Sequence, residues 1–258
     1  MSRRGATVAI VVAKAPVPGR VKTRLCPPLT PVEAAAVAEA ALTDTLEAVL
    51  RCGADRFLLA LDGDPGPWLP PGFEVVGQRG DGLDQRLAAA WDDADGPGVQ
   101  VGMDTPQLQA ADLDLALALL DDHGAALGLA DDGGWWAIAL RRPDPVCFLG
   151  VPMSTARTGR AQRRRLLDLG LSVADLPSLR DIDEIDDLLA VAAEHPDLRV
   201  STAATPLLAP VSAANEPARS ERRLSGLRSD KASRFCSPPE RRGKTGGERA
   251  TTQRREAQ

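Results

Sequence analysis

The chain has 258 residues, of which 43% are hydrophobic, and this is ample for the core of one large α/β domain or two small ones. Its four cysteines lie far apart and form no CxxC pair, which argues against a zinc site or a disulfide framework and favours a cytoplasmic location. The formal net charge is −5, although residues 216–258 carry twelve Lys and Arg against six Asp and Glu. The rest of the chain is therefore strongly acidic, which argues against nucleic acid as a specific partner.

The first predicted element is a strand at residues 8–13, where the β-branched run VAIVVA is typical of a central parallel strand. This run is too short to span a membrane and is interrupted by Lys14, so no membrane span is expected. A signal for export is the alternative interpretation of the N-terminus.

A basic loop, KAPVPGRVKTRL, follows this strand and contains the cations Lys14, Arg20, Lys22 and Arg24. Their side chains could donate charge-assisted hydrogen bonds to phosphate groups, and Gly19 would let the backbone approach a phosphate closely. The alternative is an ordinary solvated loop, since neither a Walker loop nor GxGxxG is present.

Predicted helices and strands then alternate along the chain. Thr30 and Glu33 form a capping box that opens a helix running to about Cys52. Further strands are predicted at residues 57–61, 73–76, 100–103, 125–130, 136–140 and 171–176, with helices between most of them. This alternation predicts a Rossmann-like, mostly parallel sheet flanked by helices, in which the loops after the strands open into one crevice.

The loop QRGDGLDQRL, residues 78–87, opens into this crevice after the third strand. Gly80 and Gly82 bracket Asp81 in a turn that could approach a base or a ribose, with Gln78 and Arg79 as hydrogen-bonding groups. A tight turn with a helix cap explains the same residues equally well.

Carboxylates follow two later strands. In GMDTPQL, Pro106 keeps Thr105 out of the helical region, so the strand should stop at Asp104, and a carboxylate at a strand's carboxyl end is a candidate metal ligand. The alternative is that Thr105 and Pro106 simply start a helix at residues 107–122. Asp131 and Asp132, before two glycines, could share a cation or act as a base, or could form only a turn.

Three later segments complete the prediction. The adjacent Trp135 and Trp136 should point to opposite faces of the sheet, so that one is free to stack on a ligand. Residues 148–160 contain hydroxyls and arginines suited to the acceptor side of a site. Asp183 and Asp186 suit the acidic start of the last helix, with metal contact by Asp181 or Asp183 as the other interpretation.

The C-terminal residues 204–258 are basic and rich in Ser, Pro, Gly and Arg, with few large apolar side chains. Such a segment cannot bury enough surface to order itself, so a disordered tail is predicted after a domain at residues 1–203. Loose binding of polyanions by this tail is one possibility, and a solvated extension without a role is the other.

Five motifs in this order also resemble a known family: KAPVPGRVKTRL, QRGDGLDQRL, GMDTPQL, ADDGGWWAIAL and DIDEIDDL. They are similar to the bacterial glycosyltransferase-like proteins of the nucleotide-diphospho-sugar transferase superfamily, in a branch labelled as a domain of unknown function or as an arsenosugar-biosynthesis-type glycosyltransferase. The resemblance covers about residues 7–193 and implies a single GT-A domain.

The resemblance implies roles for several of these residues. Asp104 stands at the metal-binding aspartate, and Asp132 stands at the acidic position before the paired glycines. The nucleotide-phosphate loop is matched by Lys14, Lys22 and Arg24. The chain departs from the family at Asp131, where Glu is usual, and at Trp135 and Trp136, where two tyrosines are usual, and this affects acceptor binding more than donor binding.

The expected function is that of a metal-dependent glycosyltransferase that uses a nucleotide-sugar donor and a small-molecule acceptor. Asp104 would hold Mg²⁺ or Mn²⁺ on the diphosphate, and Asp132 or Asp131 would act as a base or orient the acceptor. One alternative is a nucleotidyltransferase, guanylyl- or cytidylyltransferase-like, that acts on a nucleoside triphosphate and a phosphorylated substrate. Another is a non-catalytic nucleotide-binding protein. The base, the sugar, the acceptor, the stereochemistry and the oligomeric state are not determined by these patterns.

Overall fold

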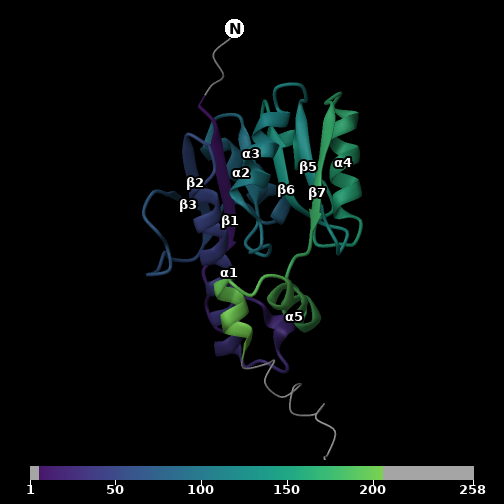
Figure 1. Ribbon diagram of the computed structural model, residues 1–258. Helices are drawn as coiled ribbons and strands as arrows, with labels where there is room; N and C mark the ends of the chain where they lie inside the picture. The colour runs from purple at the N-terminus through teal and green to yellow at the C-terminus, as the bar shows by residue number, and fades with distance from the viewer. Residues whose placement is uncertain (1–5, 206–258) are drawn as a thin grey trace, which may run out of the picture. The chain divides into compact units, whose positions relative to one another are not determined.

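A computed structural model describes residues 6–205, which all lie in one compact unit of the chain. Its centre is a seven-stranded sheet in the order β3-β2-β1-β4-β6-β5-β7 (Figure 1). The strands are β1 (Val8–Lys14), β2 (Arg56–Asp62), β3 (Glu74–Gly77), β4 (Gly98–Val101), β5 (Ala125–Ala130), β6 (Trp135–Leu140) and β7 (Val173–Leu179). Only β6 runs antiparallel to its neighbours, β4 and β5, so the predicted mostly parallel sheet is confirmed.

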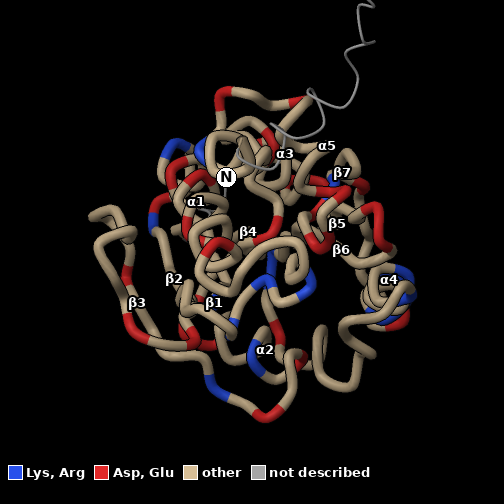
Figure 2. The backbone as a smooth tube through the Cα atoms, turned by 90° about the horizontal axis from the view of Figure 1, so that it is seen from below, with Lys and Arg blue, Asp and Glu red and all other residues tan. Residues whose placement is uncertain are grey.

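Helices cover both faces of this sheet. They are α1 (Pro31–Leu50), α2 (Leu83–Ala94), α3 (Ala110–Leu119), α4 (Thr158–Asp168) and α5 (Ile185–Glu194), with short 3-10 turns η1 (Thr23–Leu25) and η2 (Pro145–Cys147). Buried residues of α1 and α3 pack on one face of the sheet, and those of α2 and α4 pack on the other (Figure 2). The predicted capping box of Thr30 and Glu33 is present at the start of α1.

A third apolar cluster lies beyond the carboxyl ends of the strands. It joins the first half of α1 and Leu25 of η1 to Leu188 and Val191 of α5 and to Val200. Figure 1 shows α5 in this position, beneath the ends of the strands. The cluster therefore holds the segment between β7 and α5 close to the edge where the parallel strands end.

Several predicted boundaries were wrong: the last strand, predicted at residues 171–176, is β7 (Val173–Leu179), and two other differences lie closer to the site. Strand β4 ends at Val101 rather than just before Asp104, because β6 pairs only with Gly98–Val101 and residues 102–104 already form a loop. Helix α3 begins at Ala110 and is capped at Gln109, whose backbone N–H donates to Asp112, so Thr105 is not its cap. Thr105 is instead buried in the loop before it.

The described fold continues slightly past the predicted domain boundary at residue 203. Residues 199–205 are helical, and Ala204 is buried in the third cluster. The rest of the predicted tail, residues 206–258, lies outside the described residues. Between residues 6 and 205, no helix combines the length and the apolar character needed to cross a membrane.

Asp44 of α1 is a buried carboxylate that fastens this last helical segment. It accepts hydrogen bonds from the backbone N–H groups of Arg199 and Val200, at 3.2 and 3.0 Å. We expect Asp44→Ala to lower the free energy of unfolding by about 1–2 kcal/mol, because two helix-terminal donors lose their acceptor. Urea denaturation measures this loss.

The matched control is Glu47→Ala, which removes a partner of Arg199 at 2.7 Å and leaves the two backbone N–H bonds to Asp44 in place. Because this ion pair is half-exposed, its loss should cost no more than about 1 kcal/mol. Equal losses in the two variants would show that Asp44 acts only as a counter-ion of Arg199 and not as a cap.

Candidate functional site

Two adjoining pockets lie at the edge of the sheet where the parallel strands end. We call the larger one, of about 550 Å³, the basic pocket, because its lining includes Lys14, Arg20, Lys22, Arg24 and Arg86. We call the smaller one, of about 230 Å³, the acidic pocket, because its lining includes Asp104, Asp132 and Asp181 and, among the described residues, no Lys or Arg. Asp104, Met103 and Ser154 line both pockets, so the two share a wall.

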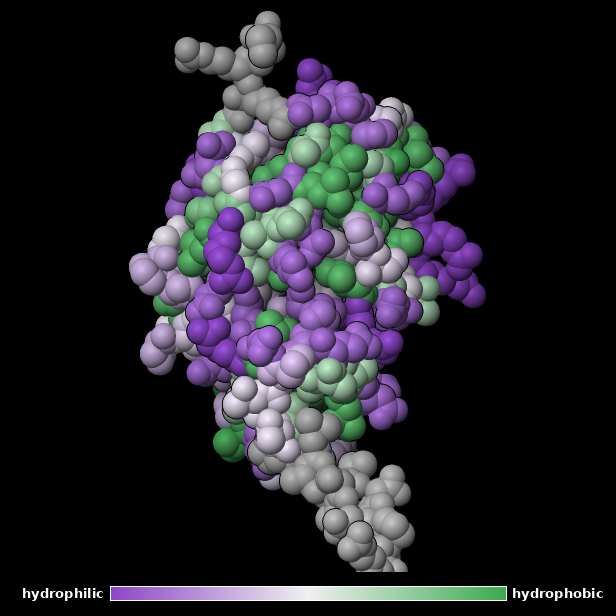
Figure 3. Space-filling view, viewed as in Figure 1, coloured by the Kyte–Doolittle hydropathy of each residue, from purple (hydrophilic) through white to green (hydrophobic). Residues whose placement is uncertain are grey.

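The polar character of this edge is visible in two views. Figure 2 looks onto the ends of the strands and shows basic and acidic segments near the centre of the sheet edge. Figure 3 shows hydrophilic side chains gathered at the level where the strands meet the α5 region. The prediction that the loops after the strands open into one crevice is therefore confirmed for the basic loop, Asp104 and Asp132.

Lys22 lies between the two pockets and already has acceptors for its charge. Its Nζ donates to Asp104 Oδ1 at 2.5 Å and to the carbonyl oxygen of Ile182, and the side chain is only 6% exposed. Its backbone is left-handed, with φ 48°, and is fixed on either side by the buried Val21 and Leu25. Lys22 thus joins the basic loop to the loops that follow β4 and β7.

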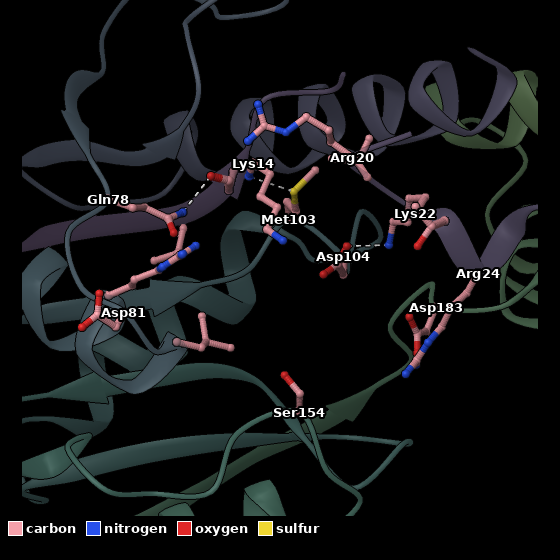
Figure 4. Close-up of a pocket in the computed structure, with 16 residues that line it drawn as sticks. Lys14, Arg20, Lys22, Arg24, Gln78, Asp81, Met103, Asp104, Ser154 and Asp183 are labelled. Atoms are coloured by element: carbon pink, nitrogen blue, oxygen red, sulfur yellow. Dashed lines mark hydrogen bonds and ion pairs between the residues drawn. The ribbon is translucent and has the colours of Figure 1, made fainter. Parts of the chain in front are cut away.

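The other cations of the basic loop are freer. Figure 4 shows the Lys14 side chain extending from the end of β1 into the basic pocket. Arg20 lies 3.9 Å from Asp62 and is mostly exposed, and Arg24 pairs with Asp183 at the far side of the pocket. Gly19, with φ +78°, does not line the pocket, and its place is in the turn closed by the hydrogen bond from Arg20 N to Val17 O.

The loop after β3 contributes one fixed acceptor. Gln78 Nε2 donates to the carbonyl oxygens of Ala13 and Ala60, at 2.8 and 3.1 Å, and this orientation leaves Oε1 facing the basic pocket (Figure 4). Asp81 lines the same pocket. Gly80 does not, and it serves the turn itself: its φ is +123°, and a Cβ there would lie 2.5 Å from Gln85 Cβ.

Only one of the two predicted carboxylates after β5 reaches a pocket. Asp132 lines the acidic pocket, and its Oδ1 accepts a hydrogen bond from Gly134 N at 2.6 Å. Asp131 lines neither pocket and lies 3.8 Å from Arg180. The tight turn requires glycine at 133, where φ is +88° and a Cβ would lie 2.3 Å from Ala156 O.

The tryptophans that follow point as predicted to opposite faces of the sheet. Trp136 is buried in the core beneath α1 and α3, whereas Trp135 packs on the other face and lines the acidic pocket. The predicted acceptor-side segment also contributes to this pocket, through Ser154, Thr155 and Thr158. The acidic pocket therefore combines carboxylates, hydroxyls and one aromatic ring.

Asp181 is a site residue that the sequence patterns named only in the less favoured interpretation, as a metal contact. It lines the acidic pocket directly after β7. Burial and, to a smaller extent, the negative charges of Asp132 and Asp104 raise its pKa to about 6, although a backbone hydrogen bond and the nearby Lys22 act in the opposite direction. The signal that could have found it is its position after a strand, at the same edge as Asp104. The cap of α5 is Glu184, paired with Asp187, and not Asp183, whereas Asp186 lies in the first turn of the helix as predicted.

The donor chemistry of the acidic pocket suits a hard divalent cation. Carboxylate oxygens are the ligands that Mg²⁺ takes, and a cation would relieve the repulsion from Asp132 and Asp104 that adds to burial in raising the pKa of Asp181. Among residues 6–205, no three His, Cys, Asp or Glu side chains are already placed to hold a metal ion. The pocket therefore has suitable ligand types without a preformed cage.

Comparison with known proteins identifies the family. A family described as an uncharacterized protein conserved in bacteria (DUF2064) matches residues 36–155. The 3-phospho-D-glycerate guanylyltransferase of Phenylobacterium zucineum (strain HLK1) is 34% identical over 185 residues, which cover 66% of this chain and 84% of that protein. The chain belongs to the DUF2064 family. Its predicted membership of the nucleotide-diphospho-sugar transferase superfamily is confirmed, although the curated relative is a guanylyltransferase and not an arsenosugar-type glycosyltransferase.

A solved structure agrees with this assignment. A protein of Desulfovibrio desulfuricans G20, provisionally named a nucleotide-diphospho-sugar transferase, is 26% identical to the DUF2064 chain, with a TM-score of 0.72. The match covers 80% of this chain and 97% of that one. The DUF2064 chain is accordingly a transferase of the nucleotidyl or nucleotide-sugar kind, with the nucleotide-diphospho-sugar transferase fold.

The raised pKa of Asp181 predicts a pH-dependent stability. Folding raises this pKa from 3.8 to about 6, so ionising Asp181 costs stability as pH rises through this range, and the cost is complete above it. Asp181→Asn removes this ionisation and should therefore raise the melting temperature at pH values above about 7. The corresponding gain in the free energy of unfolding should be roughly 1–2 kcal/mol after allowance for solvent screening. The gain should vanish below about pH 4.

Thermal melts from pH 4 to 8 check this expectation. Asp186→Asn is the matched control, because Asp186 is exposed in the first turn of α5 and should show no gain at neutral pH. A gain of the same size at acid and neutral pH would contradict an electrostatic origin of the effect.

Proposed function

We propose that this DUF2064 protein is a nucleotidyltransferase. It would transfer a nucleoside monophosphate from a nucleoside triphosphate to the phosphate of a small-molecule acceptor. The observation that carries this proposal is the shared wall of the basic and acidic pockets at Asp104, since it lets a polyphosphate and an acceptor meet at one carboxylate. The similarity to a guanylyltransferase supports the same reaction.

The triphosphate would lie in the basic pocket. Lys14, Arg20 and Arg24 line this pocket and would hold phosphate oxygens by charge-assisted hydrogen bonds. Gln78 Oε1 and the Asp81 carboxylate are acceptors that would receive N–H or O–H groups of the base or ribose. Gly19 and Gly80 would support this binding indirectly, through the turns that they allow.

The acceptor would lie in the acidic pocket with a divalent cation. We propose Asp104 as a ligand of Mg²⁺ or Mn²⁺, with Asp132 and Asp181 as neighbouring oxygen donors. When bound, the cation neutralises charge on the phosphate oxygens and on the departing pyrophosphate. An anionic acceptor needs such a cation here, because the described lining of this pocket contains no Lys or Arg.

The proposed reaction does not require a general base. An oxygen of the acceptor phosphate attacks the α-phosphorus, the bond to the β-phosphate bridging oxygen breaks, and pyrophosphate leaves. A phosphate oxygen is already anionic near neutral pH, so Asp132 would orient the acceptor or its cation and would not need to remove a proton. Asp131, held near Arg180, would act only on the shape of the turn.

The name of the curated relative suggests the first substrates to test. That protein is a guanylyltransferase of 3-phospho-D-glycerate, so GTP and phosphorylated carboxylic acids are the first candidates for this chain. The whole activity is proposed for one cytoplasmic domain, which was predicted at residues 1–203 and whose described fold continues to residue 205. A glycosyltransferase that uses a nucleotide sugar is the second candidate, favoured by the name of the Desulfovibrio neighbour.

Product analysis separates the two candidates. We expect pyrophosphate and a nucleotidylated acceptor when the full chain is incubated with Mg²⁺ or Mn²⁺, a nucleoside triphosphate and a phosphorylated acid. Pyrophosphate release and mass spectrometry of the product measure this. Release of a nucleoside diphosphate from a nucleotide sugar, without pyrophosphate from any triphosphate, would instead support the glycosyltransferase.

Substitution of single carboxylates tests the placement of the site. Asp104→Asn should lower kcat/KM by about a hundredfold or more, because it removes a charged oxygen from the shared wall where the cation and phosphates meet. Asp131→Asn, one residue from Asp132 but outside both pockets, is the matched control and should stay within about tenfold of the parent. Steady-state kinetics measure both effects. A larger loss of kcat/KM in Asp131→Asn than in Asp104→Asn would show that the proposed location of the site is wrong.

A further inference from the structure

Lys22 was predicted to bind phosphate, yet its ammonium group hydrogen-bonds to groups beside the acidic pocket. It donates to Asp104 Oδ1 at 2.5 Å and to the Ile182 carbonyl oxygen, with a side chain that is 6% exposed. Among residues 6–205 it is the one Lys or Arg that hydrogen-bonds to Asp104. Figure 4 shows this ion pair, with the Lys14 ammonium group free of it.

The contact excludes a second cation from the same oxygen. A divalent ion bound to Asp104 Oδ1 would lie beside the ammonium group, and two positive charges at such a distance repel strongly in a partly buried site. Within the described residues, Asp132 and Asp181 form no ion pair with a Lys or Arg, and the charge of Lys22 acts on Asp181 from nearby, so Lys22 is the main resident counter-charge of the acidic pocket. A metal ion that binds Asp104 Oδ1 must therefore compete with Lys22.

Polyphosphate offers Lys22 another partner. Lys22 also lines the basic pocket, so its ammonium group can turn from Asp104 to phosphate oxygens without a change in the fold. The backbone of Lys22 stays in place during this movement, because the buried side chains of Val21 and Leu25 anchor the loop on either side of it. The long side chain alone can make this exchange, and it would leave Asp104 free for a metal ion.

We propose that Lys22 is an internal counter-ion that keeps the metal off Asp104 until a nucleotide arrives. Nucleotide phosphates draw the ammonium group away, and the divalent cation then takes its place on Asp104. Metal and nucleotide thereby bind cooperatively, each tightening the other. This inference rests on the proposed metal-dependent nucleotide chemistry and adds an order of binding to it.

Metal affinity of the nucleotide-free chain tests the proposal. Binding of Mn²⁺ to the full chain is measured by electron paramagnetic resonance, without nucleotide or acceptor. Lys22→Met keeps the length of the side chain and removes its charge, and it should bind Mn²⁺ about tenfold more tightly than the parent. Lys14→Met is the matched control, since Lys14 lines the basic pocket but does not contact Asp104, and its Mn²⁺ affinity should stay within about twofold of the parent.

Affinity for Mn²⁺ that is unchanged or weaker in Lys22→Met would overturn the proposal. An equal gain in both variants would also overturn it, because general loss of positive charge would then be sufficient. Neither result depends on nucleotidyl transfer. Tighter metal binding by Lys22→Met in a chain that transfers no nucleotide would uphold the counter-ion and reject only the function proposed above.

A second measurement needs no variant and covers the case in which Lys22→Met does not fold. Reductive methylation of the parent chain, followed by mass spectrometry, compares labelling of Lys22 and Lys14. Lys22 should be labelled more slowly, with or without millimolar Mn²⁺, because Asp104 and Ile182 hold its ammonium group. Equal labelling of the two lysines, or faster labelling of Lys22 when Mn²⁺ alone is added, would contradict the proposed exclusion.

Discussion

The ion pair of Lys22 with Asp104 is the interaction on which the site depends. It joins residues 82 positions apart, and the bond from the same ammonium group to Ile182 spans 160 positions. A partly buried ammonium group must keep such acceptors, since an unpaired charge costs several kcal/mol of free energy. One side chain therefore draws together the loops after β1, β4 and β7.

The sheet topology explains why these loops are close enough to meet. Strand β6 is inserted antiparallel between β4 and β5, and the turn that leads into it contains Asp132. The third apolar cluster includes Ile182 and holds α5 beneath the ends of the strands. The segment between β7 and α5, which contains Asp181, is thereby brought next to Asp104. The backbone N–H of Ile182 donates to Asp104 O at 2.8 Å, which closes this approach.

The gathering of three carboxylates in the acidic pocket costs folding free energy, and such a cost is typical of a functional site. Carboxylates at positions 104, 132 and 181 share a pocket, and burial together with repulsion from the other two raises the pKa of Asp181 to about 6. A core selected only for stability would not collect them in this way, and shifted pKa values are typical of sites that bind ions or perform chemistry. The neighbouring basic pocket places the opposite charge within reach, which is what a metal-bridged polyphosphate requires.

Local patterns in the sequence determined the elements of this protein, because hydrophobic periodicity, capping and glycine turns act over a few residues. They located most strands, the capping box at Thr30, the opposite faces of Trp135 and Trp136, and the edge that holds Asp104 and Asp132. Only the tertiary structure decided that β6 runs antiparallel, that Asp131 turns to Arg180 while Asp181 enters the site, and that Lys22 binds Asp104. Each of these depends on contacts between residues far apart in the chain, and such contacts leave no periodic trace in the sequence.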